Sequence, residues 1–108
     1  MISELEEMKN QVLSRVDIRQ ILQEFGIPYK ESYGRVIFSL REEKNPSCSA
    51  VFMDGCWKWR DFGDPSLRGT VIHLYSYLKY GECSFSWEAA KEIAEKYLNS
   101  SPVEFESS

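Results

Sequence analysis

The strongest constraint on the fold is a change of residue pattern in the middle of the chain. Between about residues 34 and 63, β-branched and aromatic residues, which favour strands, gather in three short runs. The runs are Arg35–Ser39, Ser49–Met53 and Cys56–Arg60. Asp54-Gly55 joins the last two, and this dipeptide is typical of a type I′ hairpin turn. The pattern predicts a three-stranded antiparallel sheet.

Helical periodicity flanks this sheet on both sides in the sequence. Apolar residues recur at three- and four-residue spacing, which predicts helices over residues 3–16, 17–26, 70–81 and from Ser84 or Ser86 to about residue 98. Asp17 and Thr70 are typical N-caps, and Gly26 and Gly81 are typical of helix ends. We expect Gly63–Gly69 to form a loop. The fold class predicted is α+β.

The length of the chain allows one hydrophobic core. It has 108 residues, of which 43% are hydrophobic and 28% charged, and this composition excludes a disordered or coiled-coil protein. We expect one domain over residues 1–98, with residues 1–15 as an added N-terminal helix. Residues 99–108, polar apart from Val103 and Phe105, are expected to form a flexible tail.

Several features that the sequence lacks limit the cellular location and the chemistry that we expect of this protein. It has no apolar run near 18 residues and no basic-then-apolar N-terminus, so we expect a cytoplasmic protein without membrane contact. Cys48, Cys56 and Cys83 lack close spacing and are interpreted as reduced core thiols. His73 is interpreted as an ordinary helix residue. No catalytic motif is present, and we expect neither an enzyme nor a cofactor.

A series of motifs extends over roughly residues 16–98. The first motif is Glu43-Lys44-Asn45-Pro46-Ser47, whose composition predicts a turn. Gly63 and Gly69-Thr70-Val71-Ile72 follow it, and Ser84-Phe85-Ser86-Trp87-Glu88-Ala89-Ala90 is expected to open the last helix. In their order, these motifs resemble the N-terminal zinc-ribbon domain of bacterial DnaG-type DNA primases. The resemblance implies a ribbon fold and a role in engaging single-stranded template. Polymerisation in that family belongs to a separate, larger domain.

The metal ligands of that family are missing here. Alignment on Pro46 puts the family's Cys, His, Cys and Cys at positions occupied by Phe38, Arg41, Trp59 and Phe62, which offer no zinc donor. We therefore predict a metal-free relative in which three rings converge on the Arg41 guanidinium. Burial of each large side chain contributes about 1.5–3 kcal/mol, and a partly desolvated cation–π contact about 1–2 kcal/mol. An accidental correspondence, with these aromatic residues as ordinary core, is the alternative.

The sheet region also carries the means to bind nucleic acid. Residues 29–70 contain seven Lys or Arg and six Asp or Glu, in a chain whose net charge is −4. Alternation in the third run puts Lys58 and Arg60 on one face and Trp57 and Trp59 on the other. Cations that contact phosphates and rings that stack on bases hold single strands. The predicted binding residues are Arg35, Lys44, Trp57, Lys58, Arg60 and Arg68.

Two functions remain open at this point. The first is non-catalytic binding of single-stranded nucleic acid, DNA above all, in the replication of a chromosome, plasmid or phage. The second is a protein-interaction module that contacts a replication protein through a sheet edge or the acidic helices. A solvated charged face is the ordinary alternative for the Lys and Arg residues. Salt dependence separates the two functions, because phosphate binding weakens steeply as salt rises.

Overall fold

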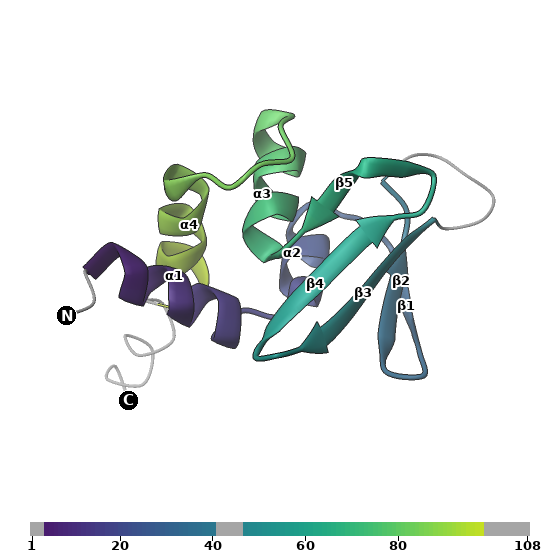
Figure 1. Cartoon of the computed structure of the whole chain (residues 1–108), viewed down its shortest axis with the longest axis horizontal. Coiled ribbons are helices and arrows are strands. Elements are labelled where there is room, and N and C mark those ends of the chain that lie inside the picture. The colour runs from purple at the N-terminus through teal and green to yellow at the C-terminus, as the bar shows by residue number, and fades with distance from the viewer. Residues whose placement is uncertain (1–3, 41–46, 99–108) are drawn as a thin grey trace.

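The computed structural model describes residues 4–40 and 47–98, which form an antiparallel sheet and a group of helices (Figure 1). Each strand pairs with its neighbours in the chain, in the order β1-β2-β3-β4-β5. The strands are β1 (Tyr29–Ser32), β2 (Arg35–Phe38), β3 (Cys48–Met53), β4 (Cys56–Asp61) and β5 (Asp64–Gly69). The helices are α1 (Glu4–Arg15), α2 (Ile18–Glu24), α3 (Val71–Tyr80), α4 (Trp87–Ile93) and the π-helix η1 (Ala94–Leu98). The α+β class is therefore as predicted.

The sheet has five strands where the sequence predicted three. β1 was not predicted because Tyr29-Lys30-Glu31-Ser32 is short and largely polar. β5 was expected to be a loop because it contains Asp64, Pro65 and Gly69, residues typical of turns. Both are edge strands, where a proline is tolerated because one side of the strand needs no ladder hydrogen bonds.

The turns and caps follow local rules. Asp54 and Gly55 have φ of 54° and 83°, so the predicted type I′ turn is confirmed and pairs Met53 with Cys56. Asp17 forms a capping box with Gln20 at the start of α2, and Thr70 forms one with His73 at the start of α3. Gly81 ends α3 in the left-handed conformation, with φ of 82°. Residue 3, the first of the helix predicted over residues 3–16, lies outside the described residues.

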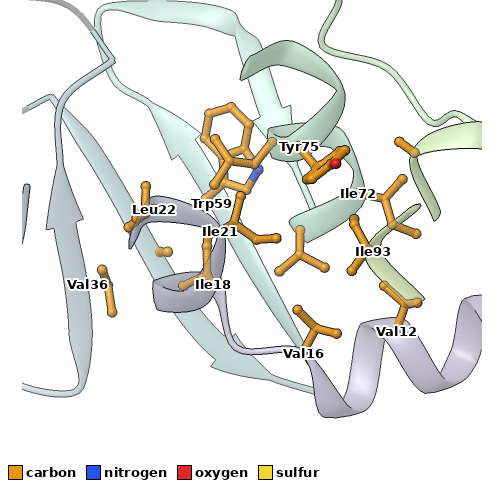
Figure 2. Close-up of a cluster of buried hydrophobic side chains, with 14 of the residues drawn as sticks. Val12, Val16, Ile18, Ile21, Leu22, Val36, Trp59, Ile72, Tyr75 and Ile93 are labelled. Carbon is orange, nitrogen blue, oxygen red and sulfur yellow. The ribbon is translucent and has the colours of Figure 1, made fainter. Parts of the chain in front are cut away.

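The core lies between the helices and one face of the sheet, here called the inner face. Alternate strand residues point into it, and Val36, Phe38, Ala50 and Trp59 are at most 3% exposed. Figure 2 shows side chains from α1, α2, α3 and α4 meeting Val36 and Trp59 in one cluster. The helices precede and follow the strands in the chain, yet in space they gather on this one side (Figure 1). The opposite, outer face therefore stays open to solvent.

The N-terminal helix belongs to this core. Val12 of α1 is fully buried, and α1 packs against β4, α3 and α4. Its acidic residues Glu4, Glu6 and Glu7 occupy the first turn, where negative charge is favoured by the helix dipole. Within the described part of the chain, no helix has the length and hydrophobicity needed to cross a bilayer.

Candidate nucleic-acid interface

Two of the four positions that align with the zinc ligands of the primase ribbons, Phe38 and Trp59, meet in the core. Phe38 on β2 and Trp59 on β4 have ring centres 6.1 Å apart and an interplanar angle of 53°. Both are almost fully buried, at 1% and 3% exposure. Trp59 Nε1 donates a hydrogen bond of 2.8 Å to the carbonyl oxygen of Thr70, so the buried indole has its polar partner. The contact ties the middle of the sheet to the start of α3.

The predicted cluster of four residues does not form as expected, because Phe62 lies at the surface. Its side chain is 61% exposed. It follows β4 in the tight turn to β5, where its backbone N–H donates to the carbonyl oxygen of Ser47 at 2.8 Å. Its ring packs against Arg60, with the guanidinium carbon 4.7 Å from the ring centre. Arg41 lies outside the described residues.

The side chains at these positions do not fit a zinc ion. Phe38, Trp59 and Phe62 carry no thiolate, imidazole or carboxylate, and two of them are buried while the third is exposed. Elsewhere in residues 4–40 and 47–98, no three His, Cys, Asp or Glu side chains come close enough to hold a metal.

The three cysteines are free thiols. Cys48 is a core residue as predicted, whereas Cys56 and Cys83 are only partly buried. Burial raises the pKa of the Cys48 thiol to about 12, and the nearby carboxylate of Asp61 acts in the same direction. Cys48 is therefore a neutral, unreactive thiol at neutral pH.

The register of the sheet gathers positive charge on the outer face. Two rows of paired residues cross that face at right angles to the strands. The first row, from β1 to β5, is Lys30, Ile37, Ser49, Arg60 and Arg68. The second, from β1 to β4, is Ser32, Arg35, Val51 and Lys58. The exposed cations in these rows, called the cationic face below, are Lys30, Arg35, Lys58, Arg60 and Arg68.

Little negative charge offsets the cationic face. Arg60 and Arg68 are directly paired across β4 and β5, and neither has a carboxylate partner among the described residues. Like charges in direct register repel each other. Arg35 donates a 3.3 Å hydrogen bond to Ser49 Oγ. Lys58 Nζ lies 3.7 Å from Asp54 Oδ2, and the side chains of Lys58 and Asp54 are about half or more exposed. An anion placed between Arg60 and Arg68 would relieve the repulsion.

Two hollows open on this face and adjoin at Lys58, Trp59 and Arg60. The smaller, of about 220 Å³, is lined by Arg35, Ser49, Val51, Lys58, Trp59, Arg60 and Phe62. The larger, of about 500 Å³, is lined by Lys58, Trp59, Arg60, Ser66, Arg68, Gly69, Thr70, His73 and Cys83. None of the described residues lining either hollow carries a carboxylate. Both hollows therefore combine cations and hydroxyl groups, the donors that phosphate oxygens accept from.

Four of the six predicted binding residues lie together on the cationic face: Arg35, Lys58, Arg60 and Arg68. Lys44 lies outside the described residues. Trp57 lies on the inner side of β4, because neighbours along a strand point to opposite faces. It is half-buried beneath Arg19, whose guanidinium carbon is 5.8 Å from the ring centre, and beside Phe52 at 5.7 Å. Trp57 is therefore not part of this surface.

Sequence reasoning missed two members of the surface. Lys30 was missed because β1 was not predicted. The available signal in the sequence was Gly34, which forms a second tight hairpin turn with Tyr33, at φ of 78° and 51°. Phe62 was assigned to the core from its alignment position. Two signals in the sequence were available: the two-residue period of a strand puts Phe62 on the same face as Arg60, and Gly63 after it indicates a turn.

Comparison of the chain with protein-family models, curated proteins and solved structures finds no match to any of them. The functional interpretation therefore depends on the surface itself and on the motifs in the sequence.

Proposed function

We propose that this chain is a non-catalytic domain that binds single-stranded nucleic acid, DNA in particular, on the cationic face of its sheet. The observation that carries the proposal is the direct pairing of Arg60 with Arg68, without a carboxylate partner among the described residues. Such an arrangement is unfavourable in the free protein and becomes favourable when a phosphate lies between the two guanidinium groups.

The geometry supports a single strand in preference to a duplex. Single strands are bound by cationic grooves that follow the phosphates, together with rings that stack on unpaired bases. Phe62 supplies an exposed ring beside Arg60, at the edge of the smaller hollow. In a duplex the bases are already stacked on each other, and the ring would have no partner.

From the motifs that resemble those of primase zinc ribbons, we propose that this activity serves DNA replication, in the cytoplasm. We propose that the domain is a degenerate member of that group, in which the buried contact between Phe38 and Trp59 occupies the site of two former ligands. Burial of two such side chains contributes about 3–6 kcal/mol, and the remaining stability comes from the core shared with the helices.

The test is a titration of a fluorescein-labelled thymidine oligonucleotide, followed by anisotropy at about 50 mM and about 200 mM salt. If about three to five phosphates are neutralised, the affinity should fall roughly 20- to 100-fold between the two conditions. Binding that is absent, or that does not respond to salt, would contradict the proposal.

A pair of double variants locates the surface. R60A/R68A should weaken binding at low salt by at least roughly tenfold and reduce the salt dependence, because each lost phosphate contact lowers the slope. The matched control is R15A/K91A, which removes the same charge from two exposed helix residues that have no carboxylate partner among the described residues. An equal loss in both variants would mean that only net charge matters and would rule out the assigned face.

Docking on a replication protein is the second candidate function. The acidic first turn of α1, formed by Glu4, Glu6 and Glu7, favours it as a surface for a basic partner. In that case, the oligonucleotide would not bind, and a protein complex would be unaffected by R60A/R68A.

A further inference from the structure

The larger hollow extends beyond the sheet to the loop that joins α3 and α4. On the sheet side it is bounded by Arg60 and Arg68, and on the helix side by His73 and Cys83. Cys83 Sγ lies 3.2 Å from the carbonyl oxygen of Arg68, which brings the loop against the end of β5. The cationic face is therefore continuous with the surface of this loop.

His73 holds a fixed position at this junction. Gly69 allows it, because a Cβ atom there would lie 2.3 Å from His73 Cγ, and because its φ of 140° disfavours other residues. His73 Nδ1 accepts a hydrogen bond of 3.2 Å from the backbone N–H of Thr70. The imidazole ring is held between the end of β5 and the loop.

Two exposed aromatic rings continue from His73. Its ring centre is 6.3 Å from that of Phe85, and Phe85 lies 4.8 Å from Trp87 in a perpendicular arrangement. Phe85 and Trp87 are 38% and 40% exposed, and neither is among the buried core residues. The three rings therefore form a continuous series of contacts from His73, in a hollow lined by three cations, to the exposed Trp87.

We propose that Phe85 and Trp87 form a second base-binding site, which stacks on bases of the strand as it leaves the cationic face past Arg68. This proposal rests on the proposed function, since it needs a strand on that face. Charge complementarity favours this occupant over an apolar protein segment, because phosphates that follow Arg60 and Arg68 bring their bases to the adjoining rings. Glu82 and Glu88 line a separate hollow, with Ser84 and Ser86, and so leave the larger hollow positive.

The test compares two probes of equal length, about twelve nucleotides, within the range of site sizes of such domains. One is a thymidine oligonucleotide and the other has the same phosphates on abasic sugars. F85A/W87A should weaken binding of the thymidine probe by at least about fivefold, because base–aromatic stacking is the interaction removed. It should leave binding of the abasic probe within about twofold. A purely structural role for the rings would weaken both probes alike and would overturn the inference.

Two controls complete the test. Leu5→Ala removes an apolar side chain that is 49% exposed on α1, and it should change neither affinity. In the wild-type protein, a probe containing 5-iodouracil should crosslink on irradiation to the peptide that contains Phe85 and Trp87, which tests the contact without a variant. Binding that requires Arg60 and Arg68 but shows neither the crosslink nor the F85A/W87A effect would overturn this inference and leave the proposed function intact. Failure of both probes to bind would contradict both this inference and the proposed function.

Discussion

At the scale of a single residue, the capping of α3 depends on the protonation state of His73. Its Nδ1 must be unprotonated to accept the N–H of Thr70, and it also lies 3.1 Å from Thr70 Oγ1. Burial lowers the pKa of His73 below its usual 6.5, because the charged imidazolium is poorly solvated there. The unfolded chain therefore binds this proton more readily than the folded one.

The stability contributed by neutral His73 should be complete above about pH 6.5 and should decline as the pH falls from there towards the lowered pKa of the folded state. His73→Gln is the informative change, because Gln keeps the capping-box acceptor and does not titrate. We expect the melting temperature of the wild-type protein to fall more between about pH 7.5 and pH 5.5 than that of the variant, as followed by circular dichroism. An equal fall in the two proteins would show that His73 is not the group responsible.

At the scale of elements, the pairing of β4 with β5 includes a contact that lowers stability and would favour the binding of an anion. Arg60 and Arg68 face each other across these strands, so the free sheet carries a repulsion that a phosphate, if bound there as we propose, would remove. β5 is also the strand that leads directly into α3, through Gly69 and the N-cap Thr70. The same strand thus contributes Arg68, a proposed binding residue, and fixes the start of a core helix.

Arg68→Glu should separate the two effects. A carboxylate opposite Arg60 replaces repulsion by attraction, which should raise the free energy of unfolding by about 0.2–1 kcal/mol. The same change should lower affinity for the thymidine oligonucleotide more than Arg68→Gln does, because Gln only removes the charge. Urea unfolding and anisotropy measure the two quantities. A variant that is less stable than the wild type, or one that binds more tightly, would contradict the role of this pair.

At the scale of the whole molecule, two carboxylates join the helices that support the open sheet. Glu92 on α4 accepts a 2.9 Å hydrogen bond from Tyr75 Oη and also contacts Lys79 and Tyr80, all three on α3. Glu24 on α2 accepts from Lys96 Nζ at 2.7 Å and from Tyr97 Oη at 3.1 Å, both on η1. These contacts connect α2, α3, α4 and η1 on the side away from the cationic face.

Hydrogen bonds from Lys79 and Tyr80 lower the pKa of Glu92 to about 2, and those from Lys96 and Tyr97 lower the pKa of Glu24. Their stabilising effect is therefore present above about pH 4.5 and is lost as the pH falls towards 2. Glu92→Gln should reduce the free energy of unfolding at pH 7 by about 1 kcal/mol.

The difference between Glu92→Gln and the wild type should shrink as the pH approaches 2. Glu95→Gln, an exposed change of the same charge on η1, serves as the control and should have little effect at any pH. Chemical denaturation at several pH values measures the difference. A constant difference across the acid range would exclude the ionised Glu92 as its source.

The sequence by itself determined the features that depend on neighbours along the chain. The capping positions at Asp17 and Thr70, the left-handed end at Gly81 and the turn at Asp54-Gly55 follow from hydrogen bonds and backbone angles within a few residues. The alternation that exposes Lys58 and Arg60 on β4 is equally local, since it follows from the two-residue period of a strand.

Only the tertiary structure decided what depends on distant partners. β1 and β5 are strands because neighbouring strands supply hydrogen bonds, although their own residues favour turns or solvent. Phe62 is of a residue type that is usually buried, but the hairpin that brings β5 back beside β4 leaves its side chain exposed to solvent. Arg60 opposite Arg68, and His73 beside Phe85, are likewise products of register and packing, because strand pairing and the packing of the loop after α3 set which side chains meet.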